Sequence, residues 1–122
     1  SFQMTHKEYM WTNSTIFKYF NLDQKSDIGQ SGQFLGGILI MQKNEHLRKV
    51  LNRIYQALED DQNLFTNTYN KIDIYPGFKD NRHDQSISSI VRKMYGSIVL
   101  SDETLSHLPQ SKNWPIWATR TK

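Results

Sequence analysis

The chain has 122 residues, a formal net charge of +3 and no cysteine. This length suits one domain, over residues 1–122, that buries about two-thirds of its unfolded surface. The lack of cysteine excludes disulfides, thiolate metal sites and cysteine nucleophiles, and no apolar run approaches the roughly 20 residues of a membrane-spanning helix. Lys and Arg are scattered, so no segment resembles a nucleic-acid-binding arm. With no secretory leader visible at the start, we expect a soluble, cytoplasmic protein without a transmembrane segment.

The first third of the chain predicts one short helix and one buried strand. Residues 1–14 are polar and aromatic without a sustained period. Ser14 is a suitable N-cap for a helix over residues 15–22, and residues 23–33 have the Gly, Ser, Asp and Gln content of a loop. The continuous apolar run over residues 34–41 predicts a strand buried on both faces, as in an α/β sheet.

Two adjacent glycines, Gly36 and Gly37, interrupt this predicted strand. Glycine weakens a strand, and it often marks a place where a ligand or another backbone approaches closely. A bulge, or tight packing of a helix on the strand, explains the pair equally well.

A strongly amphipathic helix follows, opened by Asn44 and Glu45. We expect it to cover one face of the preceding strand. Glu59-Asp60-Asp61 ends it; these carboxylates could bind a metal, but solvation of a helix end is the simpler interpretation. Residues 62–79 are irregular, and a loop of this length is usually functional or contains small elements. The apolar positions of the helix are Leu47, Val50, Leu51, Ile54, Tyr55 and Leu58.

A second amphipathic helix is predicted over residues 87–95, with Asp84 as its N-cap. Gly96 is a natural C-cap, and residues 97–100 read as a short strand. The order helix, strand, helix, loop, helix, strand, tail predicts an α/β fold.

The segment Arg82–Ser86 concentrates chemistry at the start of this helix. A catalytic triad is rejected, because neighbouring residues at a helix start rarely point at one another, and Asp80, His83 and Asp84 lack a recognised metal-ligand spacing. A cation and a helix N-terminus suit an anionic group, while carboxylate and amide groups suit hydroxyls, a combination that sugars and sugar phosphates need. A well-capped surface helix remains the alternative, and a basic patch is possible from Arg82, Arg92, Lys93, Arg120 and Lys122.

Three segments together resemble a family of sugar transferases. They are QFLGGILI at residues 33–40, RHDQSI at 82–87, which is the most specific, and WPIWATR at 114–120; the pair Trp11-Thr12 also fits. With these, nearly the whole chain resembles bacterial and viral glycosyltransferases of capsule or surface-polysaccharide synthesis. More distantly, it is similar to the C-terminal, acceptor-side half of glycogenin-like enzymes of the A-type glycosyltransferase fold.

The resemblance implies transfer of a sugar from a nucleotide-sugar donor to a saccharide acceptor. Such catalytic domains are usually much longer, and their first half supplies an Asp-x-Asp metal motif that this sequence lacks. No metal ligand is therefore expected in this chain, whereas Mn²⁺ or Mg²⁺ would act in a longer parent protein. Expected partners are the nucleotide sugar, the acceptor, and either a second copy or the missing N-terminal half, with no nucleic acid.

Residue by residue, the resemblance implies two groups of functional positions. The catalytic group is Asp84, Gln85 and His83. The substrate-binding group is Gln33, Gly36, Gly37, Arg82, Ser86, Trp114, Trp117 and Arg120, the last as a phosphate contact. A non-catalytic domain that binds a saccharide or a protein is the main alternative, and a small basic RNA-binding domain, with affinity that falls steeply with salt, is a third.

Overall fold

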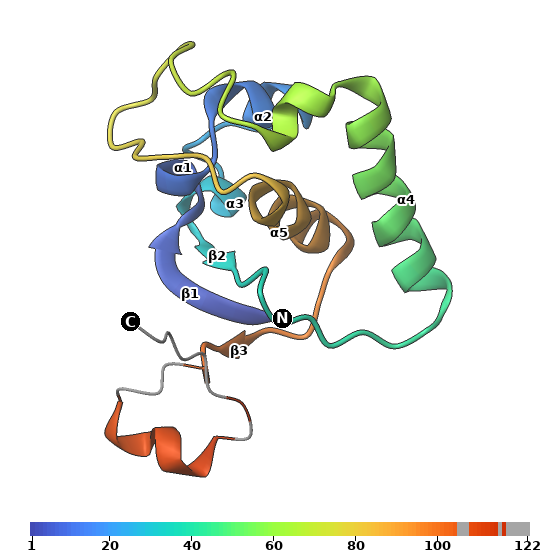
Figure 1. Cartoon of the computed structure of the whole chain (residues 1–122), viewed down its shortest axis with the longest axis vertical. Coiled ribbons are helices and arrows are strands. Elements are labelled where there is room, and N and C mark those ends of the chain that lie inside the picture. Colours follow the sequence, from blue (N-terminus) through green and yellow to red (C-terminus); the bar gives the residue numbers. More distant parts are fainter. Residues whose placement is uncertain (105–107, 115, 117–122) are drawn as a thin grey trace.

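The computed structural model describes residues 1–104, 108–114 and 116 (Figure 1). Trp117 and Arg120 lie outside the described residues. Within these residues, no helix has the length and apolar content needed to cross a bilayer. The elements in chain order are β1 (Phe2–Lys7), α1 (Glu8–Trp11), α2 (Ser14–Tyr19), α3 (Asp27–Gln30), β2 (Gly32–Phe34), α4 (Glu45–Asp60), η1 (Gln62–Phe65), α5 (Asp84–Tyr95), β3 (Leu100–Ser101) and η2 (Pro109–Asn113).

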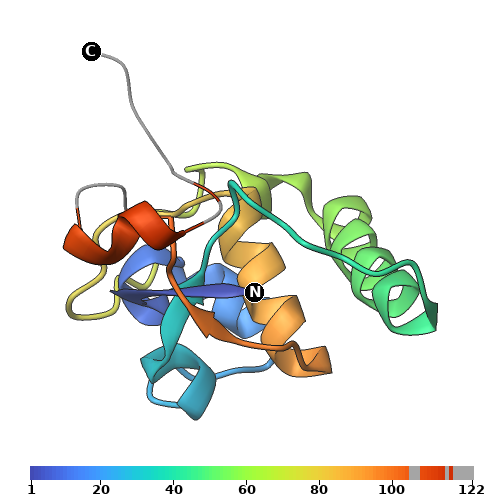
Figure 2. The same ribbon diagram turned by 90° about the horizontal axis from the view of Figure 1, so that it is seen from below.

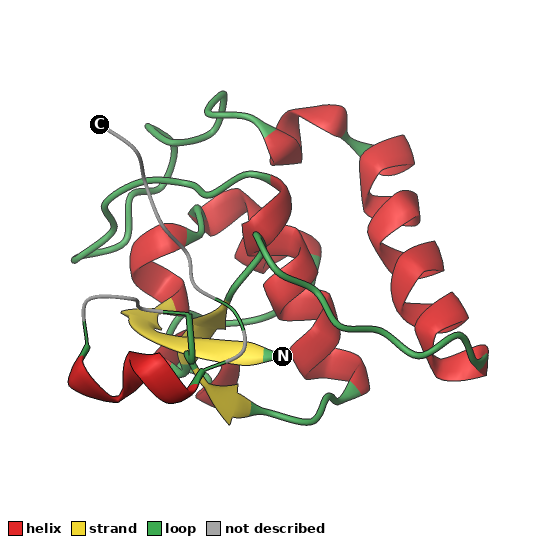
Figure 3. Ribbon diagram, turned by 60° about the horizontal axis from the view of Figure 1, so that its bottom comes forward, coloured by secondary structure: helices red, strands yellow, loops and turns green. Residues whose placement is uncertain are grey.

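The sheet has three strands in the order β2-β1-β3. β1 pairs antiparallel with β2, with an irregularity between Gln3 and Lys7, and it pairs parallel with β3 through Phe2 and Leu100. The sheet is therefore mixed, and the expected α/β class is confirmed at this level. Figure 3 shows the short strands gathered on one side of the molecule, with α4 at the opposite edge.

The α5 helix forms the centre of the fold (Figure 1). Its residues Ile87, Ile90 and Val91 are fully buried. They pack in one cluster with buried side chains of the elements around them, which is the arrangement expected when an amphipathic helix has neighbours on several sides. The other buried members of this cluster are Ile16, Phe20, Val50, Ala57 and Leu64.

The predicted helix after residue 44 is confirmed as α4, and Asn44 caps it by accepting a hydrogen bond from the Leu47 amide at 2.9 Å. The expectation that it covers the preceding strand is wrong. α4 packs against α5 and η1 instead, through Val50 and Ala57, which are buried.

The predicted buried strand over residues 34–41 is also wrong. Only Phe34 belongs to a strand, and Leu39, Ile40 and Met41 are 45%, 76% and 41% exposed. The Leu35 amide still donates to the Phe2 carbonyl of β1 at 2.8 Å, but the next amide, that of Gly36, donates to Gln85 Oε1 of α5 at 3.0 Å, so pairing with the sheet ends there.

Further differences concern two unpredicted elements near the start of the chain and the ends of others. Residues 1–14, expected to be irregular, contain β1 and α1, and the second strand is Leu100–Ser101 rather than 97–100. The helix expected over 15–22 is α2, capped by Asn13 in place of Ser14. The N-cap of α5 is His83 and not Asp84, which is the first helical residue, whereas Gly96 is confirmed as the C-cap.

Candidate functional site

An open hollow of about 510 Å³ lies at the N-terminal end of α5, and we call it the α5 hollow. Two stretches that are 49 residues apart, Gly36-Gly37 and the segment before and into α5, form its wall. Both were selected from the sequence as parts of a sugar site, and the fold brings them together. The residues lining the hollow are Trp11, Gly36, Gly37, Asp80, Asn81, Arg82, His83, Asp84 and Gln85.

Trp11 gives the α5 hollow an aromatic and cationic side. The Arg82 guanidinium carbon lies 4.1 Å from the centre of the Trp11 ring, and Lys79 Nζ lies 5.7 Å from it. The His6 and Trp11 rings pack edge to face, with their centres 5.6 Å apart. Partial burial lowers the pKa of His6, and the charges of Arg82 and Lys79 lower it further against the opposing Asp102. Trp11 Nε1 is buried without a hydrogen-bond partner among the described residues.

Acidic side chains and an imidazole form the rim of the hollow. Asp80 Oδ1 is held in place by the side-chain amide of Asn70 and by the Asn81 backbone amide, both at 2.8 Å. His83 Nε2 lies 2.8 Å from Asn67 Oδ1. His83 and Asp84 are exposed. The rim therefore offers two carboxylates and an imidazole to solvent.

His83 holds an unusual backbone conformation, with φ 52° and ψ −122°. A residue with a Cβ is rarely found there, and such strain persists only when surrounding contacts impose it. The conformation turns the chain sharply, so that α5 begins at the very next residue.

Gln33, Gln85 and Ser86 have side chains that bond inside the protein. Gln85 Nε2 donates to Gln33 Oε1 at 2.7 Å, while Gln85 Oε1 accepts the Gly36 amide. Ser86 Oγ donates to the Trp11 carbonyl at 2.7 Å and accepts the Arg82 amide at 3.0 Å. These three residues therefore hold the wall of the hollow, and Gln33 and Ser86 are fully buried.

Glu8 is the centre of this buried network, and the sequence analysis missed it. It is fully buried, and its carboxylate accepts hydrogen bonds from Thr12 Oγ1 at 2.8 Å, Gln33 Nε2 at 2.9 Å and Ser89 Oγ at 2.6 Å. Lys93 Nζ lies 2.5 Å from its second oxygen. No local signal marks Glu8, because it stands in a segment without period and its cation is 85 residues away.

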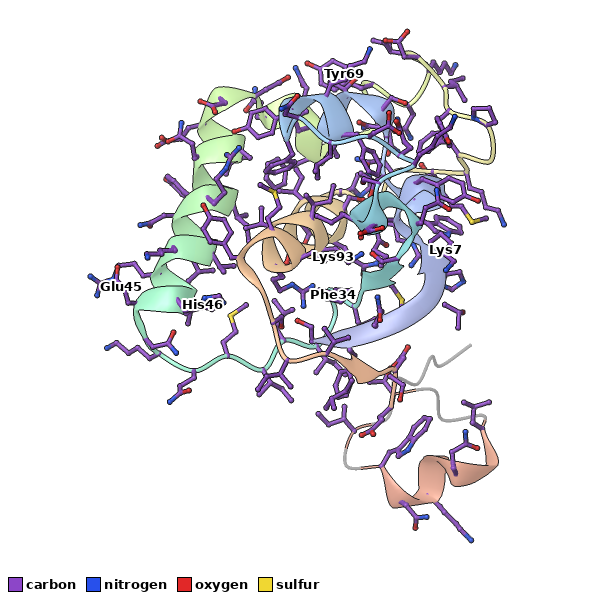
Figure 4. The ribbon with its side chains drawn as sticks, turned by 180° about the vertical axis from the view of Figure 1, so that it is seen from behind. Lys7, Phe34, Glu45, His46, Tyr69 and Lys93 are labelled. Carbon is purple, nitrogen blue, oxygen red and sulfur yellow. The ribbon has the colours of Figure 1, made fainter. Side chains whose placement is uncertain are left out.

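Lys93 is held between the Glu8 carboxylate and the ring of Phe34. Its side chain is only 7% exposed, and its ammonium lies 5.0 Å from the centre of the Phe34 ring. The two residues lie close together in the interior in Figure 4. Burial lowers the pKa of Lys93, and the charge of Glu8 opposes this shift. With Arg92 also buried, neither residue contributes to the surface basic patch considered above.

The two glycines differ in what surrounds them. A Cβ at Gly36 would lie 2.9 Å from Cβ and Cγ of Gln85, so the close approach of α5 requires glycine there. A Cβ at Gly37 would meet nothing within 4 Å. Gly37 is therefore an open position in the wall of the hollow.

Trp114 follows η2 and does not line the α5 hollow, and Trp117 and Arg120 cannot be placed relative to it. Within the described part of the chain, no three His, Asp or Glu residues lie close enough together to hold a metal ion.

Comparisons of this chain with models of protein families, with curated proteins and with solved structures find no match. What the fold and the site define is a small α/β domain with a three-stranded mixed sheet and an open polar hollow where its central helix begins.

Proposed function

We propose that this chain is the sugar-recognising part of a glycosyltransferase with a partial A-type fold, and that the α5 hollow binds a saccharide. One observation carries the proposal. Gly36-Gly37 and Arg82–Gln85, which belong to two of the segments that resemble such enzymes, line the same hollow.

The chemistry of the hollow matches that of a sugar. A sugar ring presents an array of hydroxyls and an apolar C–H surface. The exposed carboxylate of Asp84 and the fixed carboxylate of Asp80 accept hydrogen bonds from hydroxyls, and ionised acceptors make the stronger bonds. Trp11 supplies an indole, a side chain that combines a large apolar surface with one N–H donor.

The proposed reaction is transfer of a sugar from a nucleotide sugar to a saccharide acceptor in surface-polysaccharide synthesis, in the cytoplasm. Asp84 either orients and deprotonates the acceptor hydroxyl or holds the donor sugar. Arg82 offsets the charge of the leaving diphosphate. Gln85 acts as a positioning residue, because both ends of its amide already bond Gln33 and Gly36.

A metal, if the parent enzyme uses one, would take its acidic ligands from another part of that enzyme. Mn²⁺ or Mg²⁺ would neutralise the diphosphate as a Lewis acid. The alternative is a domain that binds a saccharide or a protein without turnover. It is favoured by the internal bonds of Gln33, Gln85 and Ser86, which leave Asp84 and His83 as the exposed side chains of the segment Arg82–Ser86.

Binding and turnover are tested separately. Amide and indole NMR resonances are followed while a panel of nucleotide sugars with Mn²⁺, and then simple saccharides, are added. We expect shifts at Trp11 Nε1 and at residues 36–37 and 80–85. Asp84→Asn removes the exposed carboxylate, and Gly37→Leu adds bulk at an open position; each should weaken binding at least about tenfold, or 1.4 kcal/mol.

Glu45→Gln is the matched control, because Glu45 is also an exposed carboxylate at the first position of a helix but lies away from the hollow. Its affinity should equal that of the unchanged chain. Shifts confined to another surface, or no shift at millimolar ligand, would contradict the saccharide site. Binding without sugar transfer or hydrolysis by any longer parent would leave the non-catalytic alternative.

A further inference from the structure

The outer side of α4 carries a stripe of uncovered apolar side chains. Leu47, Leu51, Tyr55 and Leu58 recur at spacings of four, four and three residues, which places them on one side of a helix. Leu51, Tyr55 and Leu58 are 46%, 62% and 41% exposed. We call these four residues the α4 stripe.

The rest of the described protein leaves this stripe open. α4 contacts α5 and η1 through the adjacent part of its surface, where Val50 and Ala57 are buried, and Leu47, the stripe residue nearest to Val50, is half-buried. Figure 2 shows α4 at the edge of the molecule, away from the sheet. Figure 4 shows Glu45 and His46 at the end where α4 begins.

Charge along α4 is divided between its two halves. The cations lie from the start to the middle of the helix, and the anions lie in its last turn. Glu45 is the exception, and its carboxylate lies 3.8 Å from the Arg48 guanidinium. This order is the reverse of what the helix dipole favours, since cations stabilise a helix near its C-terminus. Within one helix it is unfavourable, but between two antiparallel helices it is complementary. Within α4 the cations are Arg48, Lys49 and Arg53 and the anions that follow are Glu59 and Asp60, while Lys43 precedes the helix and Asp61 follows it.

The apolar side chains of the α4 stripe also face one another in this antiparallel arrangement. When two copies of α4 run antiparallel with their midpoints near Arg53, Leu51 meets the partner's Tyr55, and Leu47 meets the partner's Leu58. In the same register, Arg48 beside the stripe meets the partner's Glu59. Each contact occurs twice, as a two-fold interface requires.

We propose that this chain forms a homodimer through the α4 stripe, with the two α4 helices antiparallel. A 16-residue helix is about 24 Å long. One helix pair of that length buries less than the roughly 1,200–2,000 Å² of a standard stable interface. The dimer is therefore reversible, with a dissociation constant in the micromolar range. The proposal does not depend on the saccharide site.

Sedimentation equilibrium of the 122-residue chain tests the proposal over protein concentrations from about 5 to about 500 µM. We expect a monomer–dimer equilibrium that weakens as ionic strength rises from about 0.05 to about 0.5 M. Arg48→Glu should weaken dimerisation at least about tenfold, because two Glu residues then face each other at both ends of the interface.

Charge exchange distinguishes the antiparallel register from other arrangements. The double variant Arg48→Glu with Glu59→Arg should dimerise like the unchanged chain. A mixture of Arg48→Glu chains with Glu59→Arg chains should form heterodimers, although neither variant dimerises well alone. Lys49→Glu is the matched control. It makes the same charge change on α4, but Lys49 points about 160° away from Leu51, so the dimer should be unchanged.

A monomer at every concentration would overturn the proposal and leave the stripe to a different partner. The proposal would also be overturned if the double variant dimerised as weakly as Arg48→Glu alone, or if Lys49→Glu weakened dimerisation as much as Arg48→Glu does. Circular dichroism of each variant confirms that α4 is still helical.

Discussion

At the scale of single residues, His83 is a position of backbone strain, one of three residues other than glycine with positive φ in the described part of the chain. Its φ of 52° and ψ of −122° belong to a region that residues with a Cβ avoid, and such a conformation costs about 1–3 kcal/mol. This strained residue lies directly between Arg82 and Asp84, so the turn that costs stability is also the turn that forms the rim of the α5 hollow.

We predict that His83→Gly is more stable than His83→Ala by about 1 kcal/mol. Both variants lose the contact with Asn67, so their difference isolates the backbone. Urea unfolding measures it. At Lys49, an exposed position within α4, the order should reverse. The glycine variant there should be less stable than the alanine variant by about 1 kcal/mol. The same order at both positions would show that His83 is not strained.

Residue types in the candidate site were predictable, but the directions of their side chains were not. Arg82–Ser86 could be recognised as a polar cluster at a helix start, and the hollow contains most of it. The inward direction of Gln85 and Ser86 depends on Gln33 and on the Trp11 carbonyl. Those partners come from more than 50 residues earlier, and nothing near the cluster encodes them.

At the scale of elements, the long helices α4 and α5 were predictable, whereas β1 and the short helices α1 and α3 were not. α4 and α5 follow from the period of their own apolar residues. The strands are different, because β1 forms its ladders with β2 and with β3, and the β3 partner Leu100 stands 98 residues after Phe2 in the chain. The apolar run after Phe34 was wrongly predicted as a strand, since apolar composition cannot show that no neighbouring strand extends beside it.

The Glu8–Lys93 pair joins the element pair β1–α1 to α5, and we predict strong coupling between its members. Lys93→Met should lower the free energy of unfolding by about 3–5 kcal/mol, because it leaves a buried carboxylate without its cation. Adding Glu8→Gln should recover part of that loss. A double-mutant cycle based on urea unfolding measures the coupling.

The exposed pair Lys18–Asp73 is the control for this cycle. Its side chains are 65% and 61% exposed, so Lys18→Met should cost less than about 1 kcal/mol. Purely additive effects of Glu8→Gln and Lys93→Met would contradict the coupling.

At the scale of the whole molecule, α5 separates two surfaces. The α5 hollow opens where this helix begins, and α4 packs beside the helix with its own stripe turned outward. A dimer through the stripe therefore leaves the two hollows free, and association adds to stability in proportion to the logarithm of concentration.

We predict that the thermal unfolding midpoint rises with protein concentration over about two orders of magnitude, because only the folded chain dimerises. Arg48→Glu should remove this dependence. Calorimetry at several concentrations measures it, and Lys49→Glu is again the control. An Arg48→Glu midpoint that rises as steeply as that of the unchanged chain would contradict the link between association and stability.

The distance along the chain between Glu8 and Lys93, 85 residues, affects how the chain can fold as it is made. Synthesis at about 5–20 residues per second separates Glu8 from Lys93 by roughly 5–20 s. A buried carboxylate without its cation is several kcal/mol too costly, so the growing chain cannot close its core around the first helix during that interval. Stable burial of α1 therefore depends on a cation that α5 supplies 85 residues further along the chain.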